Sequence, residues 1–316
     1  MTPTILLIGK NGQVGSELAR ILAPTQLIAL GREELDLTRP SEVRRAIQQY
    51  RPSVIINAAA YTAVDKAEKE ESLAAAINAG APGVMAEEAK KIGALLVHYS
   101  TDYVFDGSKQ TPYAEDDSRH PLGAYGRTKL AGELAVRASG AAHLIFRTAW
   151  VYATSGKNFL LTILRLAADR EELRVVNDQF GAPTWSREIA AATARVITGG
   201  SESPNDRVLS ALKELAGTYH LTAAGKTTWH EFAVAILDEC SRLPSTTPWM
   251  AAVTGGKPVL VKRVVPIATQ DYPTPARRPP YSVLSNERFT RTFGFAIPDW
   301  RAQLSRAVHP QDGSGE

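Results

Sequence analysis

The sequence is poor in cysteine, in long apolar runs and in charge of one sign. Cys240 is the only cysteine among 316 residues, so no intramolecular disulfide forms, and we expect a small buried apolar side chain there. The apolar run at residues 4–8 is too short for a signal peptide or a membrane span. The net charge is +3, without a long run of lysine and arginine. We therefore expect a cytoplasmic protein with no nucleic-acid partner and no membrane partner.

Apolar runs and helical spacing alternate through residues 4–150. Short runs typical of buried strands occur at residues 5–8, 26–30, 54–56, 95–97 and 144–146, and helical patterns lie between them at residues 13–22, 40–50, 72–92 and around Tyr125. Such alternation predicts an α/β fold of the Rossmann type, a doubly wound parallel sheet with helices on both faces.

The order is less regular beyond Trp150. Helical patterns occur at residues 159–168, 187–197, 229–243 and 287–292, and short strand-like runs at residues 174–176, 219–221 and 259–265. We expect a dinucleotide-binding domain at residues 1–150 and a smaller, mainly substrate-binding α/β lobe at residues 151–308. Some segments of this lobe return to the Rossmann sheet in this interpretation, and residues 309–316 form a flexible tail. Residues 199–206 are turn-rich and predict a surface loop.

A glycine-rich turn follows the first strand and opens the first helix. Its glycines, Gly9, Gly12 and Gly15, are spaced G-x-x-G-x-x-G. Glycines there allow a tight turn and a close approach of a pyrophosphate, which the helix N-terminus favours with free N–H groups. A glycine-rich turn without a ligand is the alternative, but the position after the first strand favours nucleotide binding.

The second strand ends at Leu30-Gly31-Arg32. A carboxylate at this point would bind a ribose 2′-OH and repel a 2′-phosphate, and Gly31 supplies none. Arg32 suits a 2′-phosphate, so we expect NADPH, with NADH as the alternative cofactor; a solvated arginine is the other interpretation. Asp36 and Leu37, a little further on, are candidates for the adenine edge.

Tyr125 and Lys129 are four residues apart in a predicted helix and so share one face of it. An ammonium beside a phenol favours the phenolate, which predicts a lowered pKa for Tyr125 and a proton donor near neutral pH. Thr101 follows the fourth strand, at the carboxyl edge where open α/β sheets bind ligands. A hydroxyl, a phenol and a lysine at one sheet edge are typical of carbonyl reduction with hydride from a nicotinamide.

Several motifs together carry a family resemblance. They are Gly9-x-x-Gly12-x-x-Gly15, the run from Asn57 to Lys66, Ser100-Thr-Asp-Tyr-Val-Phe105, Tyr125-x-x-x-Lys129, Phe146 to Tyr152, Asn177 to Thr184, and Tyr272-Pro-Thr-Pro275 with Arg278-Pro279. The chain resembles the extended short-chain dehydrogenase/reductase superfamily and, within it, the dTDP-4-dehydrorhamnose reductases. The similarity covers roughly residues 4 to 300.

The resemblance implies reduction of the C4 ketone of a dTDP-4-keto-6-deoxy sugar to dTDP-L-rhamnose, the last step in supplying this sugar for cell-surface polysaccharide. It implies that Tyr125 protonates the new alkoxide, that Lys129 holds the nicotinamide ribose and that Thr101 orients the ketone. Implied cofactor contacts are Gly9, Gly12, Gln13, Val14, Gly15, Arg32, Asp36, Leu37, Ala60, Tyr61, Thr62, Tyr99, Tyr125 and Lys129. Implied substrate contacts are Val64, Lys66, Thr101, Asp102, Trp150, Asn177 and Arg278.

For two of these residues, a purely structural role is an alternative to ligand binding. Trp150 packs either on the ligand or in the core. Arg278 either reaches the diphosphate or ties down the proline-rich segment around it in a salt bridge.

Some members of the family dimerise through a metal held by glutamates. Glu17 and Glu287 match two of those positions, but Arg187 lies near the third, and an arginine repels a cation. We therefore expect no metal and no magnesium-bridged dimer. A homodimer formed without a metal is still possible in this interpretation.

Two rival functions remain. Sugar-nucleotide dehydratases of the same superfamily resemble Thr-Asp-Glu after the fourth strand, whereas this chain has Tyr103 in the third position. A non-catalytic nucleotide-binding regulatory subunit is the second rival, against which the intact Thr101, Tyr125 and Lys129 argue.

Overall fold

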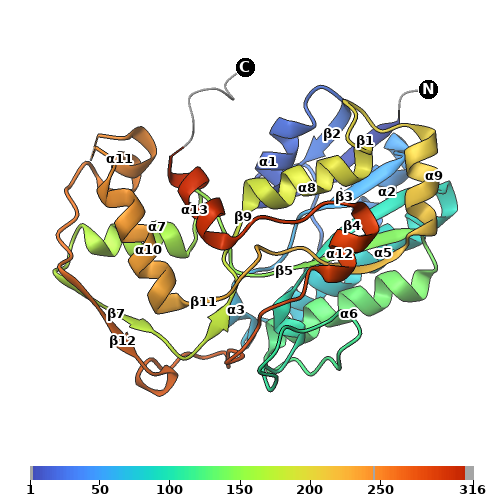
Figure 1. Cartoon of the computed structure of the whole chain (residues 1–316). Helices are drawn as coiled ribbons and strands as arrows, with labels where there is room; N and C mark the ends of the chain where they lie inside the picture. Colours follow the sequence, from blue (N-terminus) through green and yellow to red (C-terminus); the bar gives the residue numbers. More distant parts are fainter. Residues whose placement is uncertain (1–2, 245, 310–316) are drawn as a thin grey trace.

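The computed structural model describes residues 3–244 and 246–309. Its centre is a six-stranded, wholly parallel sheet with the strand order β10-β5-β4-β3-β1-β2 (Figure 1). The strands are β1 (Thr4–Ile8), β2 (Gln26–Leu30), β3 (Val54–Asn57), β4 (Leu95–Thr101), β5 (His143–Thr148) and β10 (Gly217–His220). The Rossmann-type α/β fold is confirmed.

Alternating side chains of the strands enter two separate cores. Leu7, Ile56 and Val97 face one side of the sheet, and Leu6, Ile55 and Leu96 face the other. Both sets are fully buried, as expected for a parallel sheet covered on both faces.

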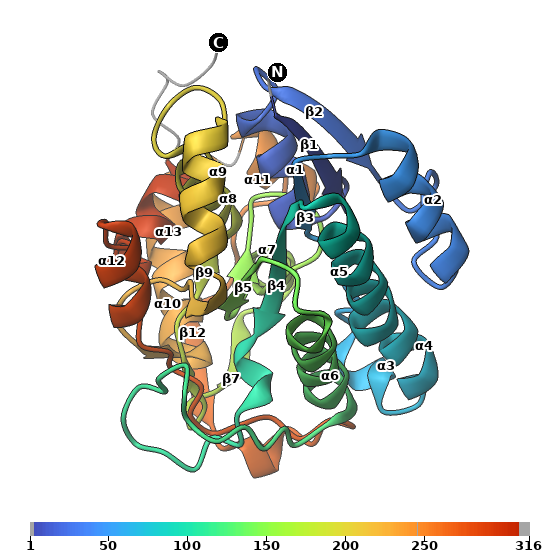
Figure 2. The ribbon, with the colours of Figure 1, turned by 90° about the vertical axis from the view of Figure 1, so that its right-hand side faces the viewer.

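Helices cover each face, as Figure 2 shows. One face carries α1 (Gln13–Ile21), α8 (Ser186–Thr198), α9 (Asp206–Glu214) and α12 (Glu287–Phe293). The other carries α2 (Pro40–Tyr50), α5 (Ala81–Ile92) and α6 (Ala124–Ser139). The short helices α3 (Val64–Ala67) and α4 (Glu71–Ala75) lie against α6, and the 3₁₀ turn η2 (Asp102–Val104) follows β4.

The helix predicted at residues 72–92 is interrupted. A π-helical turn, η1 (Ala76–Gly80), separates α4 from α5. Insertions of this kind concentrate at functional sites, and this one carries the buried Asn78.

The second lobe lies beside the sheet (Figure 1) and has a hydrophobic core of its own. It contains α7 (Phe159–Ala167), α10 (Trp229–Ser241), α11 (Pro248–Thr254) and α13 (Trp300–Val308). β7 (Glu172–Val176) pairs in parallel with β12 (Arg263–Ile267), which is followed by the 3₁₀ turn η3 (Thr269–Asp271). The two-residue strands β6 (Val151–Tyr152) and β9 (Thr184–Trp185) pair with each other, as do β8 (Phe180–Gly181) and β11 (Thr227–Thr228).

Several predicted boundaries needed correction. The strand predicted at residues 259–265 is β12 and begins only at Arg263, and α9, α11 and α13 were not predicted. α9 is short and directly follows the predicted polar loop. Its amphipathic pattern was therefore not recognised in the sequence. Cys240 is buried, and within the described residues no helix combines the length and apolarity that a membrane span requires. The predicted tail lies outside the described residues from residue 310 on.

Candidate active site

The glycine turn has the geometry that a dinucleotide requires. A Cβ on Gly15 would lie 1.9 Å from the carbonyl oxygen of Gly9, and Gly9 itself has φ 95°, so neither position tolerates a side chain. α1 begins at Gln13, and no side chain caps its first turn. The first backbone N–H groups of α1 can therefore donate hydrogen bonds to an anion, and the turn fits a pyrophosphate.

A carboxylate does stand at the end of β2, contrary to the sequence-based interpretation. Glu34 folds back, and its Oε2 accepts a hydrogen bond of 2.7 Å from the backbone N–H of Gly31. Its Oε1 lies 2.5 Å from the ammonium of Lys10, in the glycine turn. Arg32, the residue after Gly31, is exposed. The charge at this corner is therefore mixed rather than positive.

β4 ends at Thr101 and Asp102 begins η2, and both residues are buried. The Thr101 hydroxyl donates to Asp102 Oδ1 over 3.0 Å and accepts from the backbone N–H of Tyr103 over 3.2 Å. Burial raises the pKa of Asp102 to about 6. The hydroxyl and the carboxyl group are thereby fixed together at the carboxyl edge of the sheet.

α6 approaches this edge closely through Gly126. A Cβ there would lie 2.3 Å from the carbonyl oxygen of Tyr103, so the contact requires glycine. The approach places the Tyr125 ring edge-on to Tyr103, with 5.6 Å between the ring centroids. The structure therefore brings Thr101 and Tyr125 to one point, as the sequence predicted.

The predicted fall of the Tyr125 pKa is wrong for this state of the protein. Burial raises the pKa of Tyr125 to about 12, and a hydrogen bond with Thr101 opposes that shift. The ammonium of Lys129 points instead to the carbonyl oxygen of Tyr99, at 2.6 Å. Tyr125 is therefore a neutral phenol across the working pH range, which is the form that donates a proton.

Lys129 is almost fully buried. Burial lowers its pKa to about 8, and the negative charge of Glu133 opposes this shift. An ammonium has three N–H donors, and the carbonyl of Tyr99 takes one of them, so two remain for a ligand.

Asn78 is a site residue that the sequence did not reveal. It is buried in the π turn, its Oδ1 accepts from the backbone N–H of Tyr61 over 2.8 Å, and its Nδ2 donates to Thr128 over 3.1 Å. It thus joins the segment after β3 to the residue beside Lys129. The sequence pattern did not point to it, because residues 72–92 were predicted as one continuous helix.

The remaining predicted cofactor residues lie on several elements around the carboxyl edge of the sheet. The Tyr99 side chain points away into the core and bonds to Thr193 over 2.7 Å, so only its backbone faces α6. The Asp36 carboxylate is bound to Thr38. Ala60, Tyr61 and Thr62 follow β3 on the partly exposed segment that leads into α3, and Leu37 is buried after β2. Val64 and Lys66, which were predicted as substrate contacts, lie in α3 itself.

Trp150 stacks on Trp229, another residue that the sequence analysis missed. The ring centroids are 3.4 Å apart and the planes differ by 4°. Trp150 has φ 47°, a region that bulky residues rarely occupy and that marks functional positions. A Cβ on Gly181 would lie 2.3 Å from the Trp150 ring, so Gly181 gives the stack its space.

Arg278 forms the salt bridge that the sequence left open. Its guanidinium donates to both Asp65 oxygens, at 3.1 and 2.8 Å, and to the carbonyl of Ala276 at 2.9 Å. The predicted diphosphate contact would have to use the guanidinium N–H groups that this pair leaves over, or compete with Asp65. Asn177 is exposed beyond β7, where its Oδ1 accepts from Thr228 over 2.7 Å.

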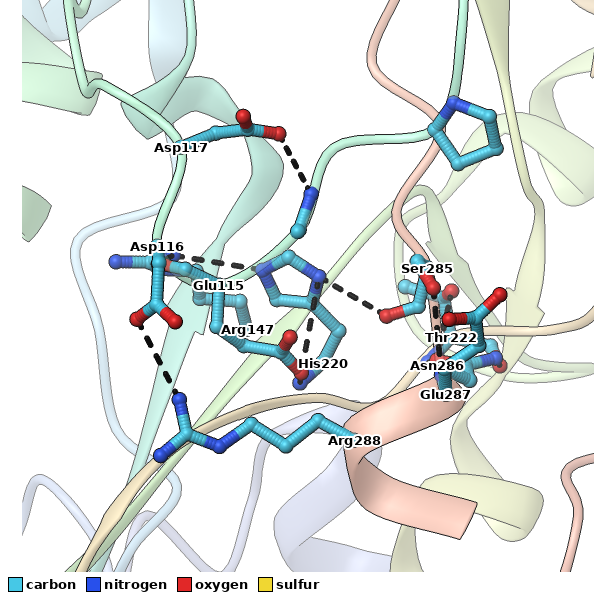
Figure 3. A network of polar contacts seen from close by, with 12 residues as sticks. Glu115, Asp116, Asp117, Arg147, His220, Thr222, Ser285, Asn286, Glu287 and Arg288 are labelled. Atoms are coloured by element: carbon cyan, nitrogen blue, oxygen red, sulfur yellow. Dashed lines mark hydrogen bonds and ion pairs between the residues drawn. The ribbon is translucent and has the colours of Figure 1, made fainter. Parts of the chain in front are cut away.

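A polar network around Arg147 fixes the strands behind the site, and Figure 3 shows its part near Glu115 and His220. Arg147, on β5, forms two hydrogen bonds of 2.9 and 2.7 Å with Glu133 of α6, and both side chains are fully buried. Ser100, next to Thr101, donates to the same Glu133 over 2.5 Å. On its other side, Arg147 reaches the carbonyl of Glu115 and His220. The network thereby ties α6 to β4 and β5.

Glu17, one of the two glutamates that match the family's metal positions, is paired with cations. Its Oε2 lies 3.2 Å from Arg187 and 3.1 Å from Arg20. The expected absence of a metal stays a prediction, as does a possible homodimer.

The sequence is similar to those of dTDP-4-dehydrorhamnose reductases. The chain matches the family described as RmlD substrate binding domain over residues 3–312. It is 51% identical over 305 residues to the dTDP-4-dehydrorhamnose reductase of Burkholderia thailandensis, which covers 96% of this chain and 97% of that protein. It is 44% identical over 310 residues to the enzyme of the same name from Escherichia coli strain K12, with 96% and 97% covered.

Solved structures of proteins with this name also resemble the structure of this chain. The dTDP-4-dehydrorhamnose reductase structure from Clostridium acetobutylicum superposes with a TM-score of 0.84 at 36% identity, covering 97% of this chain and 99% of that chain. The structure from Bacillus anthracis, a complex with NADP, has a TM-score of 0.83 at 33% identity and covers 98% and 100%.

Proposed function

Because this chain belongs to the dTDP-4-dehydrorhamnose reductase family, we propose that it reduces the C4 ketone of dTDP-4-dehydro-6-deoxy-L-mannose to dTDP-L-rhamnose with NADPH or NADH. The observation that carries the proposal is the junction of Thr101 and Tyr125 at the carboxyl edge of the sheet, beside Lys129. The Bacillus anthracis relative was solved with NADP, which supports the choice of cofactor.

The glycine turn would hold the pyrophosphate, and Lys129 would hold the nicotinamide ribose through its two remaining N–H donors. When bound, the nicotinamide supplies a hydride to C4 of the sugar. Thr101 would turn its hydroxyl hydrogen from Asp102 to the C4 oxygen and so orient the ketone. Tyr125 would give its phenolic proton to that oxygen as the C–H bond forms at C4.

The two lobes would bind different reactants. We infer that residues 1–150 bind the dinucleotide and that the lobe of α7, α10, α11 and α13 supplies substrate contacts. Trp150, on the Trp229 stack, would cover the sugar nucleotide at the border of the two lobes. Asp102 would bind the sugar hydroxyl groups beside the ketone.

The charge of Lys129 sets an alkaline limit. Its pKa is lowered to about 8 by burial, so the ammonium is present below this pH and lost above it. We expect kcat/KM for the cofactor, which reports pKa values of the free enzyme, to fall about tenfold per pH unit above pH 8. A profile that stays flat from pH 7 to pH 10 would contradict the role of the ammonium.

The Trp150 stack predicts a specific effect of Gly181→Ala. The added methyl group collides with the Trp150 ring and displaces the side chain from its place over the substrate. We expect KM for the sugar nucleotide to rise about tenfold, the scale of one lost aromatic contact, while the Kd for NADPH is unchanged. Gly80→Ala is the control, since its nearest neighbour lies 3.9 Å away. An equal effect of both changes would contradict this role of Trp150.

The direct test of the function is an assay with the purified protein. Oxidation of NADPH and of NADH is followed with dTDP-4-keto-6-deoxy-L-mannose, and the sugar product is identified by NMR. We expect dTDP-L-rhamnose in amounts equal to the cofactor oxidised. Cofactor binding without oxidation would favour the regulatory-subunit alternative instead.

A further inference from the structure

Two turns meet at the outer corner of the glycine motif. The N–H groups of Gly9 and Lys10 both donate to the carbonyl of Leu30, at 2.8 and 3.2 Å, which fastens the glycine turn to the end of β2. A Cβ on Gly31 would lie 2.8 Å from Asn11 Nδ2 and 3.3 Å from Lys10 Cε. Side chains of the glycine turn therefore surround the residue after β2.

The Lys10–Glu34 ion pair stands at this corner. One carboxylate oxygen of Glu34 is anchored on the N–H of Gly31, and the other holds the Lys10 ammonium. The Lys10 side chain is 32% exposed and that of Glu34 is 42% exposed, so a ligand can reach both. Arg32, which follows Gly31 in the sequence, is exposed.

This corner is where a Rossmann fold distinguishes its two cofactors. A carboxylate at the end of the second strand accepts a hydrogen bond from the ribose 2′-OH of NADH, whereas a cation there pairs with the 2′-phosphate of NADPH. Asp36 does not supply the carboxylate, because it is bound to Thr38 and lies 3.6 Å from Arg39. Glu34 and Lys10 thus provide both kinds of group in one ion pair.

We propose that the Lys10–Glu34 ion pair determines the choice between NADH and NADPH. With NADH, Glu34 keeps its bond to Gly31 and accepts the 2′-OH. With NADPH, Lys10 leaves Glu34 and joins Arg32 on the 2′-phosphate, which has to overcome the repulsion from the Glu34 carboxylate. The ion pair therefore lets one site accept either cofactor. This inference rests on the proposed function.

The test uses binding rather than turnover. We would measure Kd by calorimetry for adenosine 2′,5′-bisphosphate and AMP, and by fluorescence for NADPH and NADH, with wild type, Glu34→Gln and Lys10→Met. The two adenosine fragments probe this corner without the nicotinamide. Glu33→Gln is the matched control, since it removes the same charge from the neighbouring exposed position.

Glu34→Gln is expected to shift the affinity ratio toward the 2′-phosphorylated ligands by roughly five- to tenfold, and Lys10→Met to shift it about as far toward NADH and AMP. Glu33→Gln should change the ratio less than about twofold, because its charge makes no contact at the corner. A ratio in Glu34→Gln equal to that in Glu33→Gln would overturn the inference. Failure of the wild type to bind either dinucleotide would overturn the proposed function instead.

Discussion

Replacing Tyr125 with phenylalanine is expected to lower kcat for ketone reduction by about 10²–10⁴-fold, the usual contribution of a general acid. The change removes only the phenolic oxygen, and the ring keeps its edge-on contact with Tyr103. The Kd for NADPH should change little, because Lys129 still bonds to the carbonyl of Tyr99 and the glycine turn is untouched. Single-turnover kinetics and fluorescence titration measure the two quantities separately.

The matched control for this prediction is Tyr219→Phe. Tyr219 also carries a phenol on the Rossmann sheet, but its hydroxyl donates to the backbone carbonyl of Leu215 rather than to a group of the site. Its loss should leave kcat within a few-fold of wild type. If Tyr125→Phe kept the turnover of Tyr219→Phe, another group would have to supply the proton.

Arg147→Met is expected to destabilise the fold by about 3–5 kcal/mol, because it leaves the Glu133 carboxylate buried without its partner. Both side chains are fully buried, so water does not replace the lost contact. The double change Arg147→Met with Glu133→Leu should recover most of this free energy, since apolar side chains of similar size suit a buried position. Urea unfolding of the three proteins measures the difference.

Arg127→Met provides the comparison on the same helix. Arg127 pairs with Glu71 in a similar two-bond geometry, but both side chains are nearly half exposed. Water solvates the remaining carboxylate, and the loss of stability should be far smaller. Equal losses for Arg147→Met and Arg127→Met would show that burial of the Arg147–Glu133 pair has no special weight.

The parallel sheet was predictable because its strands are short runs of buried apolar residues separated by helices. Tyr125 and Lys129 were predictable as a pair because the helix repeat alone places them on one face. Thr101 could be added because the carboxyl ends of parallel strands meet at one edge. These inferences need only local patterns and the chirality of the fold.

Other residues depend on contacts between distant segments. Glu34 lies beyond the end of β2 and reaches it by folding back to Gly31. Its position in the sequence therefore did not identify it as the carboxylate at the end of this strand. Trp229 gains its significance from Trp150, on another element. The pKa of Tyr125 followed from burial rather than from the nearby lysine, and burial is a tertiary property.

The central claim is that hydride goes to the sugar C4 while Tyr125 gives a proton to the oxygen on that carbon. The most direct measurement uses NADPH labelled with deuterium at the transferred position of the nicotinamide C4, with dTDP-4-keto-6-deoxy-L-mannose as substrate, and NMR of the product. We expect one deuterium per molecule of dTDP-L-rhamnose, carried on C4. Deuterium at another carbon, or a product sugar without deuterium, would contradict it.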